Sequence, residues 1–316
     1  MTFRRSLSED FERLLELSRE FEFSPFAFDK RLKDISSSVY PAFAADMIKS
    51  PSSRTMVAEE ESQIVGFITY GFNRPISQAI GKNIGSILLL SVDKAYRQKG
   101  VGKYLVFLAL SELLGEGADI VTVGTDIYNL PAIRLYESRR FHIKMGWHIY
   151  RLYTNSLIKQ LPNPSIIPFN YNALELFIPY INRPISLFKE SEIDHQKLRN
   201  YLVENMRRSL LKGKSFAFQY IKNGQITGMI HITRDSIGEK TLQTDREVYK
   251  VLDVISLEDS NPLEIQCALL KDIPNRIENC CLLELWISAD NDTLIQAAEN
   301  AGFHLSYTGV TLHYSR

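Results

Sequence analysis

The sequence contains two copies of one pattern. The segment QIVGFI at Gln63–Ile68 recurs as QITGMI at Gln225–Ile230, an offset of 162 residues (225 minus 63). The same offset relates Asn129 to Asn291, Phe141-His142-Ile143 to Phe303-His304-Leu305, Leu90 to Leu252 and Val92 to Val254. Matches at one offset indicate an internal duplication. We therefore expect the second half to repeat the fold of the first, with residues 154–184 as a linker.

The region Gly85–Leu114 predicts a strand, a loop and a helix in succession. Ile87–Val92 is a continuous apolar run of strand length, typical of a strand covered on both faces. A polar loop, Asp93–Lys99, follows it. From Gly100 onward apolar residues occupy nearly every face of a helical pattern, so we expect a buried helix.

The loop before this helix has the composition of an anion-binding site. Its sequence, Arg97-Gln98-Lys99-Gly100-Val101-Gly102, places glycines at the start of a helix whose first N–H groups lack partners within the helix. Such an end stabilises a nearby negative group by roughly 0.3–1 kcal/mol. Positive charge is contributed by Lys94, Arg97, Lys99 and Lys103. The pattern matches neither a Walker loop nor a dinucleotide fingerprint. We expect a phosphorylated ligand, with an ordinary strand-to-helix turn as the alternative.

Val92–Lys103 resembles motif A of the GNAT-type acyl-CoA N-acyltransferases, because Arg97, Gly100 and Gly102 match its Arg/Gln-x-x-Gly-x-Gly/Ala signature. The resemblance implies that the loop amides hold the pyrophosphate of acetyl-CoA. It also implies that the preceding strand binds the pantetheine arm and the thioester carbonyl. The coenzyme-binding residues expected on this basis are Leu90, Val92, Arg97, Gln98, Lys99, Gly100, Val101, Gly102, Lys103 and Asn129.

A second motif of the same family follows. Asn129, Ala132, Tyr136 and Phe141 match motif B, Asn-x-x-Ala-x-x-x-Tyr-x-x-x-Gly-Phe, at the expected spacing. The glycine before Phe141 is replaced by Arg140, so we expect this helix to end without the left-handed turn that glycine supplies. The resemblance implies that Asn129 contacts the coenzyme arm and that Tyr136 is the catalytic acid for the departing thiolate.

The general base is not evident from the sequence. The central strand carries no acidic residue, so Asp126, Asp93 or a chain of water molecules are the alternatives. His142 and His148 are interpreted as strand residues.

The rest of the first half supports an α+β fold. The expected elements are a strand at Thr2–Arg5, helices at about 8–20 and 34–49, a hairpin over Arg54–Tyr70, a strand at Ile120–Asp126, a helix from Asn129 to Arg139 and a strand at Phe141–Tyr153. The resemblance implies two GNAT-like domains, each a mostly antiparallel mixed sheet flanked by helices, with a splayed central parallel strand pair. We place them at residues 1–153 and 185–316.

The second copy has lost the coenzyme loop. At the constant offset, Arg97, Gly100 and Gly102 become Asp259, Pro262 and Glu264, while Tyr136 becomes Ala298. We therefore expect a degenerate domain that supports the structure or shapes the substrate site.

Composition excludes several other classes. Lys plus Arg and Asp plus Glu both number 37, so no overall field favours nucleic acid or an anionic membrane. The three cysteines have no metal-site spacing, and no run approaches a membrane span. We expect a cytoplasmic protein.

The resemblance implies direct transfer of an acetyl group from acetyl-CoA to a primary amine. We expect a small-molecule acceptor, because the layout of early helices, the aromatic segment Phe21–Asp29 and one closing strand is similar to acetyltransferases that act on dTDP-linked 4-amino sugars. That segment either lines a substrate pocket or fills the core. Protein or peptide amines, antibiotics and polyamines remain alternatives, as does a non-catalytic acyl-CoA sensor or interaction protein.

Overall fold

The chain folds into two compact units. Unit 1 comprises Met1–Gly146 together with Gly309–Arg316, and unit 2 comprises Trp147–Thr308. The predicted aromatic segment Phe21–Asp29 and Asp259 lie outside the described residues. The computed structural model describes residues 1–19, 36–154, 160–181, 193–236, 238–239, 246–257 and 261–314, with the backbone alone for residues 36–40.

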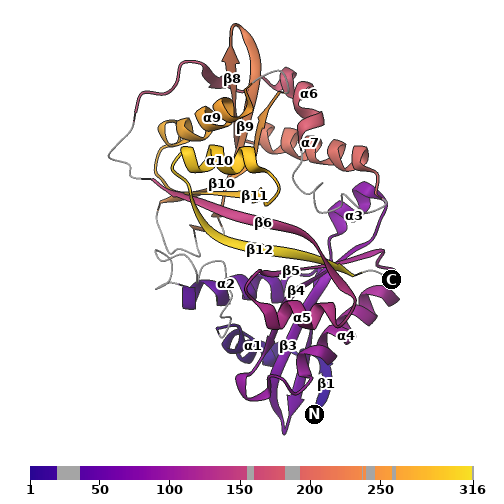
Figure 1. Cartoon of the computed structure of the whole chain (residues 1–316). Coiled ribbons are helices and arrows are strands. Elements are labelled where there is room, and N and C mark those ends of the chain that lie inside the picture. The colour runs from indigo at the N-terminus through magenta and orange to yellow at the C-terminus, as the bar shows by residue number, and fades with distance from the viewer. Residues whose placement is uncertain are drawn as a thin grey trace. The chain divides into compact units, whose positions relative to one another are not determined.

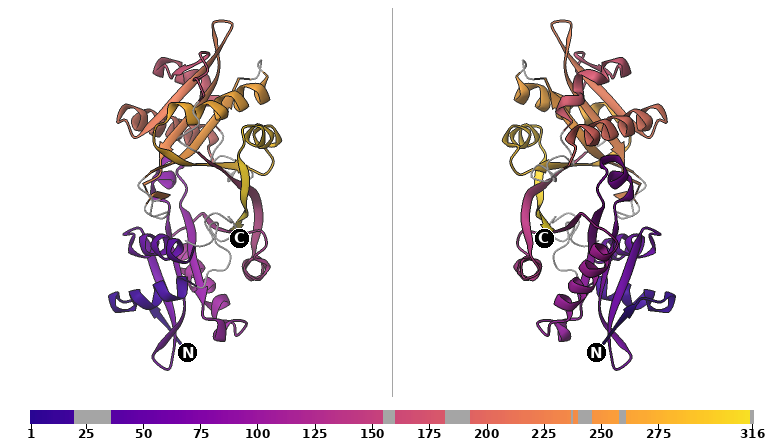
Figure 2. Two further views of the ribbon diagram at one scale, coloured as in Figure 1. Left: turned by 90° about the vertical axis from the view of Figure 1, so that its left-hand side faces the viewer. Right: turned by 90° about the vertical axis from the view of Figure 1, so that its right-hand side faces the viewer.

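Unit 1 is a mixed sheet with helices on both faces (Figures 1 and 2). Its strand order is β1-β2-β3-β4-β5-β12, in which β4 and β5 run parallel and the other neighbours run antiparallel. Its elements are β1 (Thr2–Arg5), η1 (Ser8–Asp10), α1 (Phe11–Ser18), α2 (Ser36–Lys49), β2 (Ser53–Glu60), β3 (Gln63–Phe72), α3 (Arg74–Ile80), β4 (Ile84–Val92), η2 (Lys94–Tyr96), α4 (Val101–Gly115), β5 (Ile120–Asp126), α5 (Leu130–Glu137), the start of β6 (Phe141–Tyr153) and the end of β12 (His304–Tyr314).

Two apolar layers hold this sheet. On one face, Leu14 and Leu17 of α1 pack with Phe67 and Leu89 of the sheet. On the other face, α4 and α5 pack against β3, β4 and β5. The α4 helix is less buried than expected, since Tyr104 and Phe107 on its outer side are 44% and 43% exposed. The sheet therefore covers only part of the apolar surface of α4.

The secondary structure matches most of the sequence prediction. The β2–β3 hairpin turns at Glu61 and Ser62, both with positive φ, as the favoured two-residue hairpin turn requires. The α3 helix was not predicted. Asn73 caps it by accepting from the backbone N–H of Ile76, and Pro75 lies in its first turn. This Asn-x-Pro signal was present in the sequence.

Arg140 adopts the left-handed conformation with φ of 64°. The expectation that its substitution for glycine would change this turn is therefore wrong. Phe141 follows at 0% exposure, so its burial holds the turn in place despite the residue type. In unit 2, Gly302 occupies the corresponding turn with φ of 88°.

Replacing Arg140 by glycine is expected to raise the free energy of unfolding by about 0.5–1 kcal/mol. A left-handed conformation costs an L-residue roughly 1–2 kcal/mol, and the entropy that glycine adds to the unfolded chain offsets part of this gain. The matched change Gly302→Ala should lower the stability by a similar amount. Denaturant titration measures both, and equal stability of Arg140→Gly and the wild type would contradict the strain.

Unit 2 repeats the same order of elements. The β8 and β9 strands have the bounds of β2 and β3 displaced by 162 residues. Part of the expected linker over 154–184 is structured, because β7 pairs with β8 as β1 pairs with β2. The elements are β7 (Ile166–Pro168), η3 (Tyr171–Ala173), α6 (Leu174–Phe177), η4 (Ile178–Tyr180), α7 (His195–Leu211), β8 (Ser215–Lys222), β9 (Gln225–Arg234), β10 (Glu247–Ser256), α9 (Pro262–Arg276), β11 (Cys280–Ser288) and α10 (Asp292–Asn300), with the end of β6 and the start of β12.

One strand departs from the constant offset. In unit 1 a bulge leaves Leu88 unpaired between Ile87 and Leu89, and in unit 2 the equivalent bulge leaves Leu252 unpaired. These bulged residues differ by 164 positions (252 minus 88), so the predicted equivalence of Leu90 with Leu252 is wrong by two residues. The connection to the next helix is correspondingly shorter in unit 2, at residues 257–261 against 93–100.

The two units exchange their last strands. Gly309–Tyr314 of β12 pairs with β5 and completes the sheet of unit 1. Trp147–Tyr153 of β6 pairs in the equivalent register with β11 and completes unit 2. In Figure 1 the yellow end of β12 runs beside β5. Domain limits drawn at residues 153 and 185 do not anticipate this exchange.

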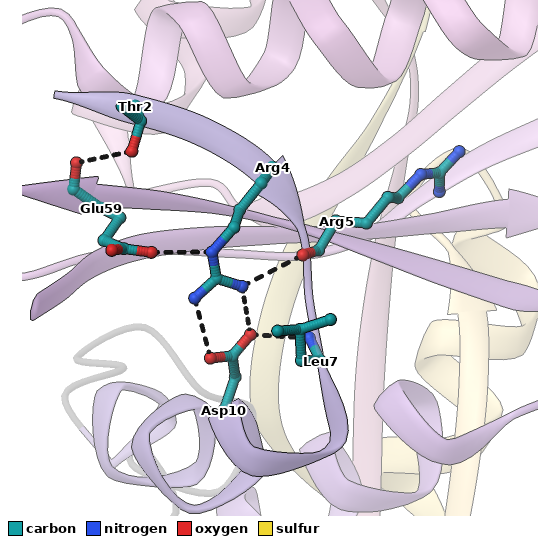
Figure 3. A network of polar contacts seen from close by, with 6 residues as sticks. All are labelled: Thr2, Arg4, Arg5, Leu7, Asp10 and Glu59. Atoms are coloured by element: carbon teal, nitrogen blue, oxygen red, sulfur yellow. Dashed lines mark hydrogen bonds and ion pairs between the residues drawn. The ribbon is translucent and has the colours of Figure 1, made fainter. Parts of the chain in front are cut away.

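An ion-pair network fastens the first strand of unit 1 (Figure 3). Arg4 donates to both carboxylate oxygens of Asp10, at 2.7 and 3.0 Å, and to Glu59 at 2.7 Å. The backbone N–H of Leu7 also donates to Asp10, at 2.7 Å. The hydrogen bond from Arg4, reinforced by that of Leu7, lowers the pKa of Asp10.

Replacing Asp10 by asparagine is expected to destabilise unit 1 by about 1–2 kcal/mol at pH 7, since charge-assisted hydrogen bonds are lost at a partly exposed arginine. Because the folded-state pKa of Asp10 is lowered, its contribution is present above the ordinary value of about 3.9 and is lost as the pH falls through the folded-state value. The denaturant midpoints of the wild type and of Asp10→Asn should therefore approach each other as the pH falls from 7 to 2. A constant difference at all pH values would exclude this linkage.

Candidate functional site

The parallel strands β4 and β5 separate partway along their length. They pair from Ile84 to Ile87 against Ile120 to Val123, and no further pairing between them is present in the described residues. The separation begins at the bulged residue Leu88. Beyond it, the backbone of β4 faces an open wedge in which an extended ligand can hydrogen-bond as a strand would. The predicted splayed strand pair is confirmed.

The wedge leads into the glycine loop and the N-terminus of α4. Gly100 has φ of 86° and directly precedes the helix, so a side chain there would be strained. A Cβ atom on Gly102 would meet only Leu135 and Val92, at 3.5 and 3.6 Å, which is ordinary contact. The protein's own packing therefore does not require glycine at residue 102. The absent side chain leaves the first turn of α4 open to a ligand.

The loop is exposed and basic. The Nε of Arg97 donates to the backbone carbonyl of Val92 at 3.0 Å, which folds this side chain back over the end of β4. Lys99 lies over the ring of Tyr96 at 5.0 Å, and Lys103 is exposed on the first turn of α4. These charges and the helix dipole favour a bound phosphate or diphosphate.

Asn129 has a structural role as the N-cap of α5. Its side chain accepts from the backbone N–H of Ala132 and donates to the hydroxyl of Thr125, both at 3.3 Å. In unit 2, Asn291 caps α10 in the same way, at 3.1 Å from the N–H of Leu294. The recurrence of asparagine is thus explained by helix capping, and coenzyme contact by Asn129 stays a prediction.

Tyr136 lies in the core of unit 1 at 5% exposure, with its ring centroid 5.8 Å from that of Phe141. Within the described residues no hydrogen bond engages its hydroxyl. Burial raises the pKa of Tyr136, so the phenol keeps its proton at neutral pH. These properties suit a proton donor.

The two candidate bases differ in availability. Asp93 is paired with Arg13 at 2.9 Å and accepts from the N–H of Ala95 at 3.0 Å. Asp126 is 2% exposed at the end of β5 and accepts from the N–H of Tyr128 at 2.5 Å. Burial raises the pKa of Asp126. Asp126 therefore takes up a proton more readily than an ordinary aspartate does.

Sequence reasoning also missed a buried polar chain in unit 2. His231 lies 3.1 Å from Asp253 and 2.9 Å from the hydroxyl of Ser215, across β8, β9 and β10. All three are at most 6% exposed. Their mutual hydrogen bonds satisfy groups that would otherwise be costly to bury. We interpret the chain as structural.

A protein-family model matches the part of the chain that contains the wedge and the glycine loop. The model of the acetyltransferase (GNAT) family matches residues 11–141, which contain β2 to β5, the glycine loop and α5. Residues 11–141 belong to the GNAT family. Unit 1 therefore contains a GNAT domain, and the strand separation and loop described above lie within the matched segment.

Two curated relatives are similar in sequence to part of this chain. N-alpha-acetyltransferase 30 of Xenopus laevis is 36% identical over 23% of this chain and 26% of its own length. The spore coat polysaccharide biosynthesis protein SpsD of Bacillus subtilis is 22% identical over 46% of this chain and 48% of its own length. The chain thus spans less than half the length of either relative.

The structural likeness covers both units. A GCN5-related N-acetyltransferase from Sphaerobacter thermophilus matches 99% of this chain and 94% of its own, with 13% identity and a TM-score of 0.62. A tandem GNAT protein from the clavulanic acid biosynthesis pathway matches 99% and 97%, with 11% identity and a TM-score of 0.53. The chain therefore has a tandem GNAT fold. No helix in the described part of the chain is long and apolar enough to span a bilayer.

Proposed function

We propose that unit 1 transfers an acetyl group from acetyl-CoA to the primary amine of a small molecule. The observation that carries this proposal is the wedge between β4 and β5, which leads into an open, basic helix N-terminus. An extended pantetheine arm fits an unpaired strand edge, and a diphosphate fits the free N–H groups of α4. The GNAT match over residues 11–141 supports the same ligand.

The residues of unit 1 divide the work between binding and proton transfer. The backbone around Leu90 and Val92 holds the arm and the carbonyl of the acetyl group, while residues 97–103 hold the diphosphate. Bound acetyl-CoA supplies the reactive thioester. Tyr136, kept protonated by burial, donates its proton to the departing sulfur. Asn129 fixes the start of the helix that carries Tyr136.

A small-molecule acceptor is supported by a pair of hydroxyls that lies beside the wedge. The hydroxyls of Ser86 and Thr122 bond to each other at 2.9 Å across β4 and β5. Such groups recognise hydroxylated ligands. Unit 2, with a shorter loop and Ala298 in place of Tyr136, supplies structural support.

Release of thiol from acetyl-CoA in the presence of glucosamine, tyramine, spermidine or a short peptide tests this function. Gly102→Glu is expected to weaken coenzyme A binding at least tenfold, because its carboxylate lies where the diphosphate would be held. The matched control is Gly115→Glu at the other end of α4, where a Cβ atom would meet nothing within 4 Å, and this variant should bind coenzyme A normally. Coenzyme binding without thiol release for any amine would instead support a sensor.

A further inference from the structure

An exposed glycine lies on β5 at the point where the wedge opens. Val121 and Val123 face the core beneath α4, so the alternating residues Thr122 and Gly124 face the opposite side of the sheet. Gly124 is exposed, and a Cβ atom there would meet only the backbone oxygen of Val310, at 3.9 Å. The sheet thus offers bare backbone at this position.

Gly124 is level with the bulge of β4. Ile87 and Val123 form the last pair of the two strands, so Leu88 and Gly124 follow it on either side of the opening. Leu88 is 38% exposed. The Ser86–Thr122 hydroxyl pair lies just before the opening, and Thr311 of β12 lies directly opposite Gly124. Gly124 is therefore bordered by one apolar side chain and three hydroxyls.

In unit 2 a tryptophan side chain occupies the position that is equivalent to Gly124. The pairing of β11 with β6 in unit 2 has the same register as the pairing of β5 with β12 in unit 1. Trp286 therefore corresponds to Gly124, and Trp147 corresponds to Gly309. The two indoles stack, with centroids 4.7 Å apart and an interplanar angle of 12°. The Nε1 of Trp286 donates to Glu284 at 2.7 Å.

An ion pair occupies the neighbouring part of this surface in unit 2. Glu284, which replaces Thr122, accepts from the buried guanidinium of Arg151 at 2.9 and 3.1 Å. Side chains of unit 2 thus satisfy one another where unit 1 presents glycine and hydroxyls. In unit 1 Gly309 is buried whereas Gly124 is exposed, so of the two positions that carry indoles in unit 2 only that of Gly124 is open to solvent.

We infer that Gly124 is the floor of the acceptor site of unit 1 and that the acceptor is an amine carried on a hydroxylated six-membered ring, as in an amino sugar. This inference rests on the proposed function. The ring occupies the position that one indole holds in unit 2. The hydroxyls of Ser86, Thr122 and Thr311 then meet the hydroxyls of the ring, and its amine faces the wedge.

The test gives unit 1 the residue of unit 2. Gly124→Trp is expected to lower kcat/KM for glucosamine at least 100-fold at saturating acetyl-CoA, while the Kd of coenzyme A measured by calorimetry changes less than twofold. Gly124→Ala should raise KM for glucosamine several-fold with little change in kcat. Trp286→Phe, the matched control in unit 2, should keep kcat/KM within twofold. With coenzyme A bound, glucosamine should raise the Tm of the wild type but not of Gly124→Trp.

The outcomes separate the inference from the proposed function. Transfer by Gly124→Trp at the wild-type rate overturns the acceptor site, while the proposed function stands. Wild-type preference for spermidine or a peptide over glucosamine overturns the ring class. A wild type that binds coenzyme A but transfers to none of the amines overturns the proposed function and the inference together.

Discussion

Replacing Tyr136 by phenylalanine is expected to lower kcat for acetyl transfer by about 100-fold or more, because a positioned proton donor contributes typically 10²–10⁴ in rate. The substitution keeps the ring that packs near Phe141 and removes only the hydroxyl. Coenzyme A binding should therefore change less than twofold. Steady-state kinetics and calorimetry on the same preparation measure the two effects.

The control is Tyr128→Phe, since Tyr128 is 71% exposed in the loop before α5 and loses the same atom. Its kcat should stay within twofold of the wild type. Because burial raises the pKa of Tyr136, wild-type activity should not fall between pH 7 and the ordinary tyrosine value of about 10 through loss of this proton. A kcat for Tyr136→Phe within threefold of the wild type would assign the proton to another donor.

Removing Gly309–Arg316 is expected to unfold unit 1 and abolish coenzyme A binding. Val310 and Leu312 are 4% and 0% exposed in its core, and burying each such side chain contributes about 1.5–3 kcal/mol. Loss of the whole β12 pairing with β5 adds to this. The sum approaches the total stability of a typical domain, roughly 5–15 kcal/mol.

Hydrogen exchange of the β5 amides and calorimetry with coenzyme A measure this loss. Because a truncated chain can fail for general reasons, Leu312→Ala provides a second test. It should destabilise by about 2–5 kcal/mol and raise exchange in β5 more than in β11. A chain ending at Thr308 that binds coenzyme A normally would show that β12 is dispensable.

The fold of unit 1 could be predicted because local signals agree with the final packing. Apolar runs give β4 and β5, Asn129 caps α5, and the Glu61–Ser62 turn closes its hairpin. Both motifs therefore fall on the elements that the sequence assigned to them. The duplication likewise predicted the order of elements in unit 2.

What could not be predicted depends on contacts between distant residues. Periodicity shows that Phe141–Tyr153 is a strand but does not say that its second half pairs with β11. The bulge at Leu88 is set by its alignment with β3, and the sequence around it is uniformly apolar. The constant offset pairs Gly124 with Trp286 in the sequence, but only the strand registers show that both residues lie opposite the exchanged strand of their unit.

The strand exchange also determines when unit 1 can be completed during synthesis of the chain. Translation proceeds at about 5–20 residues per second, so β12 leaves the ribosome about 10–30 s after Gly146. During that interval β5 has no neighbour on one side and Val121 and Val123 lack part of their apolar cover. The edge of β5 therefore stays open to other chains until β12 has been synthesised, and the sheet of unit 1 is completed only then.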